Sequence, residues 1–264
     1  MAHLLDSVTF YASFDEAVRG DFGKGGLEPT TRSGPLADPA KWAFTPGVDD
    51  KVYWISKDRG KHKGCLRAVD VLPGESGRFF FPAKGNIAFN PKGWAGTLSF
   101  WMSINPDTML RTPFCDPIQI TQQGATNGGI WIDFNDDKPR SLRMGVFPAA
   151  DPPIKETDAD APLVWVKKPG CKAGDWHHLV ITWENFDTGK PNALAKLYID
   201  GKCQGTIRDR AIAMKWDLDK AGIYVAVNYI GLLDELALFD RALSEEEIDL
   251  LADKADFLTG LGKK

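Results

Sequence analysis

Two adjacent acidic residues, Asp234 and Glu235, interrupt an apolar run that extends from Leu232 to Phe239. A carboxylate buried without a partner costs several kcal/mol, or it stays protonated. Arg241 and Arg19 are cations that could pair with Asp234, and backbone amides at a strand edge are a second kind of partner. The acidic pair therefore marks a position where a partner for the buried negative charge is expected.

The acidic residues that follow have a structural explanation. Ser244 precedes Glu247 by three residues and an apolar sequence follows, which is the pattern of a helix capping box. Glu245 and Glu246 would lie in the first turn, where the helix dipole favours negative charge. We expect a helix over about residues 245–254 and no catalytic role for these glutamates.

The rest of the chain predicts short strands. Apolar and polar residues alternate in runs separated by Gly, Pro, Asn and Asp, and the clearest run is GTLSFWMSI at residues 96–104. Two segments depart from this pattern and read as long surface loops, at about residues 23–50 and 148–165. Because the same patterning resumes after each of them, we expect one domain over residues 1–264, an all-β antiparallel sandwich or jelly roll with a short C-terminal helix.

Composition excludes several classes of function. The 264 residues carry a formal net charge of −4 and no basic stripe of the kind that nucleic acid binding requires. No apolar run approaches the roughly 20 residues that a membrane span needs. The start, MAHLLDSVTF, has no apolar core of a signal peptide, which fits either a cytoplasmic protein or a secreted one whose signal has been replaced.

The order of several motifs resembles the concanavalin A-like, laminin-G-like jelly-roll family. These motifs are YASFDE, GTLSFWMSI, DWHHLVITW, LYIDGKCQG and GLLDELALFDRALSEEEI, which together cover roughly residues 6–254. The resemblance implies two antiparallel sheets packed face to face, one of them concave. Members of the family bind glycans or protein partners, and some are hydrolases or lyases, so the fold does not decide the function.

The resemblance also implies a structural calcium ion between the first and last strands. The matching residues are Asp15 and Asp234, and Asp21 follows Asp15 in a turn flanked by glycine. Calcium takes six to eight oxygen ligands, and carboxylates brought together from distant segments repel one another without a cation. Calcium is therefore the third candidate partner of Asp234, beside the salt bridge and the backbone amides.

A catalytic pair of carboxylates is not evident. Glycosidases of this architecture carry Glu-x-Asp-x-x-Glu on one strand, whereas the segment WIDFNDD has Trp131 and Asp136 where the two glutamates would stand. A lyase would need a base beside a cation, a set that His178, Tyr198 and Arg143 could supply. We expect neither activity from these residues.

Aromatic and polar residues on the strands indicate ligand binding instead. Aromatic rings stack on the apolar faces of sugars, while neighbouring polar groups bind the hydroxyls. The candidate ligand-binding residues are Trp101, Trp131, Asp133, Arg143 and His178. Each tryptophan, taken singly, is also compatible with a place in the core.

The predicted function is a non-catalytic module that binds a polysaccharide, another glycan or a cell-surface protein, in an extracellular or periplasmic setting. The alternatives are a glycoside hydrolase or polysaccharide lyase acting in the concave groove, and a structural or adhesive surface protein without a small ligand. Four cysteines are compatible with Cys171–Cys203 and Cys65–Cys115 disulfides or with four buried thiols.

Overall fold

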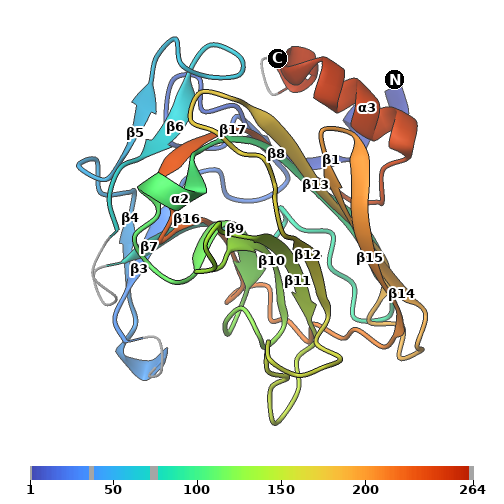
Figure 1. Cartoon of the computed structure of the whole chain (residues 1–264). Helices are drawn as coiled ribbons and strands as arrows, with labels where there is room; N and C mark the ends of the chain where they lie inside the picture. The colour runs from blue at the N-terminus through green and yellow to red at the C-terminus, as the bar shows by residue number, and fades with distance from the viewer. Residues whose placement is uncertain (1, 36–38, 72–76, 262–264) are drawn as a thin grey trace.

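The computed structural model describes residues 2–35, 39–71 and 77–261, and its strands form two antiparallel sheets. Figure 1 shows the sheets as two layers, with the C-terminal helix α3 (Glu245–Asp253) outside one of them and both chain ends beside that helix. The chain is therefore the all-β, two-sheet jelly-roll sandwich with a short C-terminal helix that the sequence predicts. No helix in the described residues is long and apolar enough to cross a membrane.

The nine-stranded sheet has the order β15-β14-β13-β8-β17-β1-β2, with β6 pairing to β17 and β5 pairing to β6. Its strands are β15 (Lys202–Arg210), β14 (Ala193–Ile199), β13 (His177–Phe186), β8 (Trp94–Ser103), β17 (Gly231–Phe239), β1 (Val8–Ala12), β2 (Phe22–Gly23), β6 (Cys65–Ala68) and β5 (Tyr53–Ser56). The first and last strands of the fold, β1 and β17, are therefore neighbours, as the resemblance implies.

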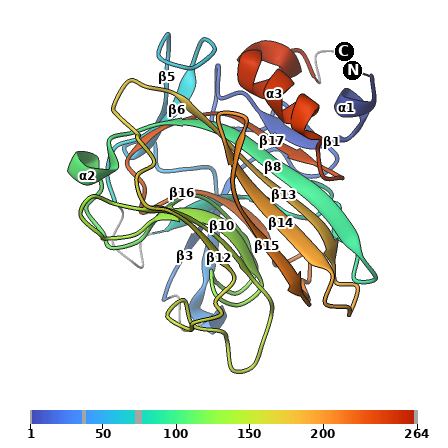
Figure 2. The same cartoon turned by 45° about the vertical axis from the view of Figure 1, so that its right-hand side comes forward.

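The eight-stranded sheet has the order β12-β11-β10-β9-β16-β7-β3-β4. Its strands are β12 (Leu163–Val166), β11 (Leu142–Phe147), β10 (Gly129–Phe134), β9 (Cys115–Thr121), β16 (Gly222–Val227), β7 (Arg78–Pro82), β3 (Thr30–Ser33) and β4 (Ala43–Pro46). Figure 2 shows β10 and β12 in the layer opposite β8, β13 and β14. Short helical turns complete the fold: α1 (Ala2–Asp6), η1 (Pro39–Lys41), α2 (Pro106–Met109) and η2 (Ala255–Leu258).

The alternation read from the sequence decides which side chains fill the space between the sheets. On β8, Leu98, Phe100 and Met102 point into the main core, while Ser99 and Trp101 lie on the opposite, outer face. A second, smaller apolar cluster lies on that outer face of the nine-stranded sheet, where α3 packs with Ile248 and Leu251. The capping box of α3 is confirmed, because the Glu247 amide donates to Ser244 Oγ (3.3 Å) and the Ser244 amide donates to Glu247 Oε2 (3.0 Å).

Some sequence-based expectations about elements are wrong. The segment 23–50 is not only a loop, since β3 and β4 form a hairpin that extends the eight-stranded sheet at its edge. Likewise β12 lies at the end of the segment 148–165. The sequence patterning did not indicate β16, a central strand buried on both faces whose GIYVAV run shows no alternation.

Candidate functional site

The outer face of the eight-stranded sheet brings together three of the predicted ligand-binding residues. Asp133 on β10 lies directly opposite Arg143 on β11, and Trp131 stands two residues before Asp133 on the same face. The Trp131 ring packs where Gly145 has no side chain, because a Cβ at Gly145 would come within 2.1 Å of the ring. Trp131 is 1% exposed, so its ring is not open for stacking on a sugar.

Arg143 is the centre of this face. Its Nε donates to Asp133 Oδ1 (2.8 Å), a second guanidinium nitrogen donates to Asp133 Oδ2, and Nη1 contacts Glu156 Oε2 at 2.7 Å. The guanidinium carbon also lies 5.0 Å from the ring centre of Trp165 and 5.3 Å from that of Phe114. Paired carboxylates and flanking aromatic faces hold the planar cation in one orientation.

Burial alters the acid strength of the carboxyl groups below this surface. It raises the pKa of Asp133 to about 6, although the hydrogen bond from Arg143 opposes the rise. Burial raises the pKa of Asp116 further above its ordinary value, and the charges of Asp133 and Glu156 add to that rise. In the side-chain orientation that satisfies both of its amide atoms, Gln119 donates to Asp116 Oδ2 at 3.0 Å and accepts from the Ala125 amide at 3.0 Å. The site thus holds a buried acid that favours its protonated form next to an ion pair.

Two cavities open on this face. The larger, of about 880 Å³, is lined by the ring faces of Phe114 and Trp165, by Arg143, and by the polar residues Asn135 and Asp136. The smaller, of about 170 Å³, shares Phe114 with it and extends towards β16 and β3. Trp165 and Phe114 remain 43% and 49% exposed, which is unusual for such large apolar groups. We call the larger cavity, which has the rings of Phe114 and Trp165 in its lining, the β10–β12 groove.

The other two predicted ligand-binding residues, Trp101 and His178, lie on the outer face of the nine-stranded sheet, away from Arg143. Their rings stack at 5.0 Å, His178 Nε2 lies 2.8 Å from Ser99 Oγ, and the Lys61 ammonium group sits 4.3 Å from the Trp101 ring centre. Burial lowers the pKa of His178 to about 4. The structure therefore divides the predicted set between two faces, and His178 and Arg143 do not assemble into a lyase site.

Asp234 is hydrogen-bonded by backbone amides. Its Oδ2 accepts from the amides of Lys61 (2.7 Å) and His62 (3.1 Å), and its Oδ1 accepts from the amide of Glu235 (3.0 Å). Burial raises the pKa of Asp234 to about 8, and these hydrogen bonds oppose the rise. Of the protein groups left open by the sequence, the backbone amides contact Asp234, whereas Arg241 pairs with Glu247 and Arg19 with Glu28.

Glu235 shares the outer face with Asp234 because of a bulge. The register between β17 and β8 gains one residue between Asp234 and Ala237, and Glu235 takes a left-handed φ of 52°. Tyr11 donates to Glu235 Oε2 at 2.5 Å, while no hydrogen-bond partner for the buried Glu235 Oε1 lies among the described residues. Burial raises the pKa of Glu235 to about 9, and the charge of Asp234 adds to the rise.

The residues expected to bind calcium lie near this pair but use their oxygens elsewhere. Asp21 Oδ2 accepts from the amide and hydroxyl of Ser13 at 2.7 Å, and Asp15 accepts from the amide of Gly64 at 3.2 Å. Across residues 2–35, 39–71 and 77–261, no group of three or more His, Cys, Asp or Glu side chains is arranged to hold a metal ion. The Asp234 carboxyl group accepts its hydrogen bonds from backbone amides. The calcium ion stays a prediction.

The cysteines are free thiols in the structure. Cys65 and Cys115 are buried, Cys171 is half-buried and Cys203 is exposed. The two disulfides considered from the sequence, Cys171–Cys203 and Cys65–Cys115, are therefore not formed in the structure.

Sequence reasoning missed three residues of the β10–β12 groove: Phe114, Glu156 and Trp165. Trp165 carried a usable signal, because in the run LVWV its neighbour Val164 packs into the core while Trp165 points outward. Glu156 carried none, since it stands in a Pro-rich acidic segment without periodicity.

Comparisons with known proteins agree with this architecture. No curated protein sequence matches the chain. Domain 4 of AbnA, a GH43 extracellular arabinanase from Geobacillus stearothermophilus solved with arabinotriose, is similar with a TM-score of 0.53 at 16% identity, over 93% of this chain and 99% of that one. The receptor binding domain of botulinum neurotoxin C/D mosaic serotype gives a TM-score of 0.58 at 13% identity, over 96% of this chain and 52% of that one.

A third similar structure is the botulinum neurotoxin serotype D ligand binding domain in complex with N-acetylneuraminic acid, with a TM-score of 0.53 at 13% identity, over 97% of this chain and 53% of that one. The chain thus spans about half the length of these toxin domains. At such identities the likeness shows the fold alone. A family model described as the concanavalin A-like lectin/glucanases superfamily matches residues 81–249, which is more than half of the chain. The chain therefore belongs to the concanavalin A-like lectin/glucanases superfamily.

Proposed function

We propose that this protein is a non-catalytic carbohydrate-binding module whose glycan lies in the β10–β12 groove. The observation that carries the proposal is the pair of exposed rings, Trp165 and Phe114, on either side of an immobilised Arg143. Exposed large aromatic groups that flank a polar centre are typical of sites that receive a ligand with both apolar and hydroxyl faces.

The chemistry of the groove suits a sugar. The ring of Trp165 offers a flat apolar surface for the C–H face of a pyranose or furanose, while Asn135, Asp136 and Asp137 supply polar groups along the same cavity. A volume of about 880 Å³ is sufficient for an oligosaccharide, since ligand pockets commonly have roughly 300–1,000 Å³. We therefore favour a chain of sugar residues over a single one.

Binding without catalysis is favoured by the state of the carboxyl groups. Hydrolysis would need two of them placed on either side of the scissile bond, one as acid and one as base or nucleophile. Both oxygens of Asp133 are engaged by Arg143, and Asp133 and Asp116 are 3% and 8% exposed. The alternative is a carbohydrate-active enzyme that uses the exposed Asp136 and Asp137 of the same cavity.

The similar structures support a proposal about the location and the partner of this protein. They include a domain of an extracellular arabinanase in complex with arabinotriose and a toxin domain in complex with N-acetylneuraminic acid. By analogy we propose an extracellular or periplasmic location and, as partner, a polysaccharide or a glycan on a cell surface. A structural calcium ion at Asp15, Asp21 and Asp234 is part of this proposal.

A glycan array with the purified protein tests the proposal, followed by a reducing-end assay on each glycan that binds. We expect at least one oligosaccharide to bind without release of product, and Trp165→Ala to weaken that binding by at least about tenfold, the usual size of a stacking residue's contribution. Trp54→Ala is the matched control, because Trp54 is also exposed (37%) but lies on the nine-stranded sheet. Product release would establish the enzyme, and equal binding by Trp165→Ala would remove the groove from the proposal.

A further inference from the structure

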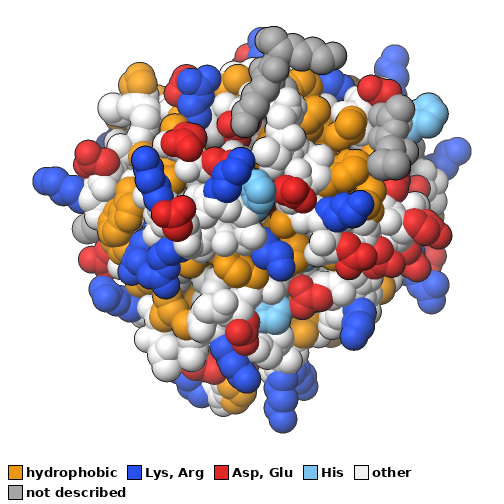
Figure 3. Space-filling model, turned by 90° about the horizontal axis from the view of Figure 1, so that it is seen from above, with side chains coloured by type: hydrophobic (Ala, Val, Ile, Leu, Met, Phe, Trp, Pro, Cys, Tyr) orange, Lys and Arg blue, Asp and Glu red, His pale blue; other side chains and the backbone are white. Residues whose placement is uncertain are grey.

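The segment of residues 57–67 is strongly basic in an acidic chain. It contains five Lys or Arg residues and one Asp, whereas the whole chain has a net charge of −4. The segment forms the turn after β5 and then strand β6, which pairs with β17 in the nine-stranded sheet. It is thus remote from the β10–β12 groove, which lies on the other sheet. In the view from above, basic and acidic side chains are scattered over most of the surface, and several acidic side chains lie together near its right edge (Figure 3).

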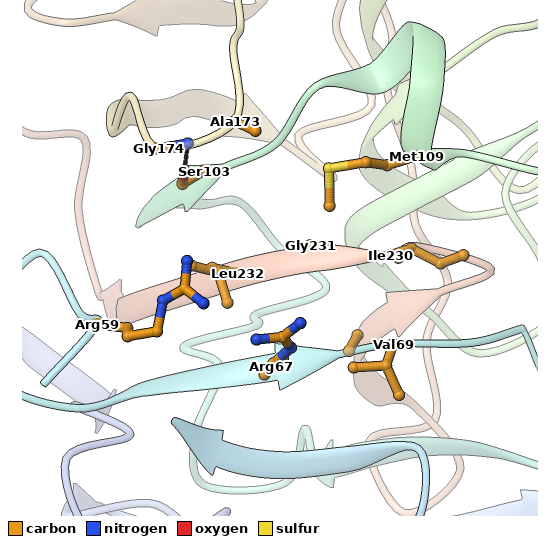
Figure 4. A pocket seen from close by; sticks show the side chains of 11 residues that line it. Arg59, Arg67, Val69, Ser103, Met109, Ala173, Gly174, Ile230, Gly231 and Leu232 are labelled. Atoms are coloured by element: carbon orange, nitrogen blue, oxygen red, sulfur yellow. Dashed lines mark hydrogen bonds between the residues drawn. The ribbon is translucent and has the colours of Figure 1, made fainter. Parts of the chain in front are cut away.

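Two arginines of this segment face a small cavity at the end of the nine-stranded sheet. The cavity has a volume of about 150 Å³ and is bounded by four segments: the Arg59 turn with β6, the end of β8 with α2, the loop at Gly174, and the start of β17. Figure 4 shows the guanidinium groups of Arg59 and Arg67 turned into this space. The cavity is therefore lined by two cations that come from the turn and from a strand.

The strand register fixes part of this arrangement. Arg67 on β6 lies opposite Leu232 on β17, and Leu232 lies opposite Ser103 on β8, so the three side chains form one row across the sheet. Ser103 Oγ accepts from the Gly174 amide at 3.1 Å, which ties the loop to the row. Apolar side chains of Met109 and Ile230 form the opposite wall (Figure 4). The cavity is a preformed feature of the packed strands.

Among the described residues, no carboxylate pairs with either of the two arginines. None of the residues that line the cavity is acidic, and within the described ranges no acidic side chain forms an ion pair with Arg59 or Arg67. The nearby Asp70 pairs with Arg111 at 2.8 Å. Two guanidinium groups that share a cavity repel each other, and each offers several N–H donors in a planar fork suited to an oxyanion.

We propose that this cavity is an oxyanion-binding site, which takes the carboxylate or sulfate group of a small ligand between Arg59 and Arg67. A cavity of about 150 Å³ is known to admit a molecule the size of benzene, so the buried part of the ligand is a group of about six non-hydrogen atoms. The apolar wall of Met109 and Ile230 would contact the carbon portion of that ligand. This site is separate from the proposed glycan groove and does not depend on it.

Isothermal titration with sodium sulfate and with sodium acetate, at an ionic strength held constant with sodium chloride, tests the proposal. We expect saturable binding of at least one of the two anions, and preference between them identifies the sulfate or the carboxylate as the group recognised. Arg59→Ala and Arg67→Ala should each weaken that binding by at least about tenfold, because each removes charge-assisted hydrogen bonds. Arg67→Lys should recover only part of the affinity, since lysine keeps the charge without the fork.

Arg208→Ala is the control, because this substitution removes the same charge from β15, where the Arg208 side chain is 72% exposed. Trp165→Ala should also leave anion binding unchanged, which separates this site from the glycan groove. Melting curves of all variants establish that they are folded. Binding that does not saturate, or equal binding by wild type and the Arg59→Ala/Arg67→Ala double variant, would overturn the proposal.

Discussion

Replacing Glu235 by glutamine should stabilise this protein, and the gain should grow as the pH rises. Burial raises the pKa of Glu235 from 4.5 to about 9, so the folded protein keeps a proton that the unfolded chain loses above pH 4.5. A group whose folded pKa is raised in this way lowers stability with increasing pH, because the folded state binds more protons than the unfolded state. The window of this loss runs from about pH 4.5 to about pH 9.

The size of the effect follows from the shift. Each pH unit within the window costs about 1.4 kcal/mol, so the interval from pH 4.5 to 7 costs about 3 kcal/mol as an upper value. Glutamine has the shape of the protonated carboxyl group and does not titrate, and its oxygen can still accept from the Tyr11 hydroxyl. We therefore expect Glu235→Gln to raise the free energy of unfolding at pH 7 by up to about 3 kcal/mol, or the melting temperature by roughly 6–12 °C.

Urea unfolding of wild type and Glu235→Gln at pH 5, 7 and 9, in a buffer with EDTA, measures this difference. Glu184→Gln is the control, because it makes the same substitution at an exposed position on β13. If Glu235→Gln is less stable than wild type at pH 7, or if the difference does not change with pH, then Glu235 is ionised in the folded state and the reasoning is refuted. Repeating the series with calcium in place of EDTA shows whether a cation takes over that charge.

Three further predictions concern other parts of the chain. Ser244→Ala should lower the free energy of unfolding by about 1 kcal/mol through loss of the capping box at α3, and an unchanged urea midpoint would contradict this. The calcium prediction requires that EDTA lower the melting temperature of wild type and that Asp234→Ala abolish the effect; identical melting curves with and without EDTA would remove calcium. Thiol titration in denaturant without reductant should find four free cysteines, with Cys203 reacting first in the folded protein, whereas a count of two would indicate a disulfide.

Some features of the site could be read from single strands. The alternation in β10 and β11 places Trp131, Asp133 and Arg143 on polar positions of strands, and the structure brings those three side chains together. The same rule could not show that Trp101 and His178 lie on a different sheet. Periodicity states which residues share a face of one strand, but it contains no information about which sheet that strand joins.

By itself the sequence determined the β-sandwich class, the period-two burial of β8 and the capped helix α3, because each depends on residues a few positions apart. Only the tertiary structure decided the partners of the charged groups. The amide of Lys61 reaches Asp234 across 173 residues, and Glu156 reaches Arg143 from a segment without any pattern. Such contacts depend on sheet order and on the paths of loops, and no local spacing specifies either of them.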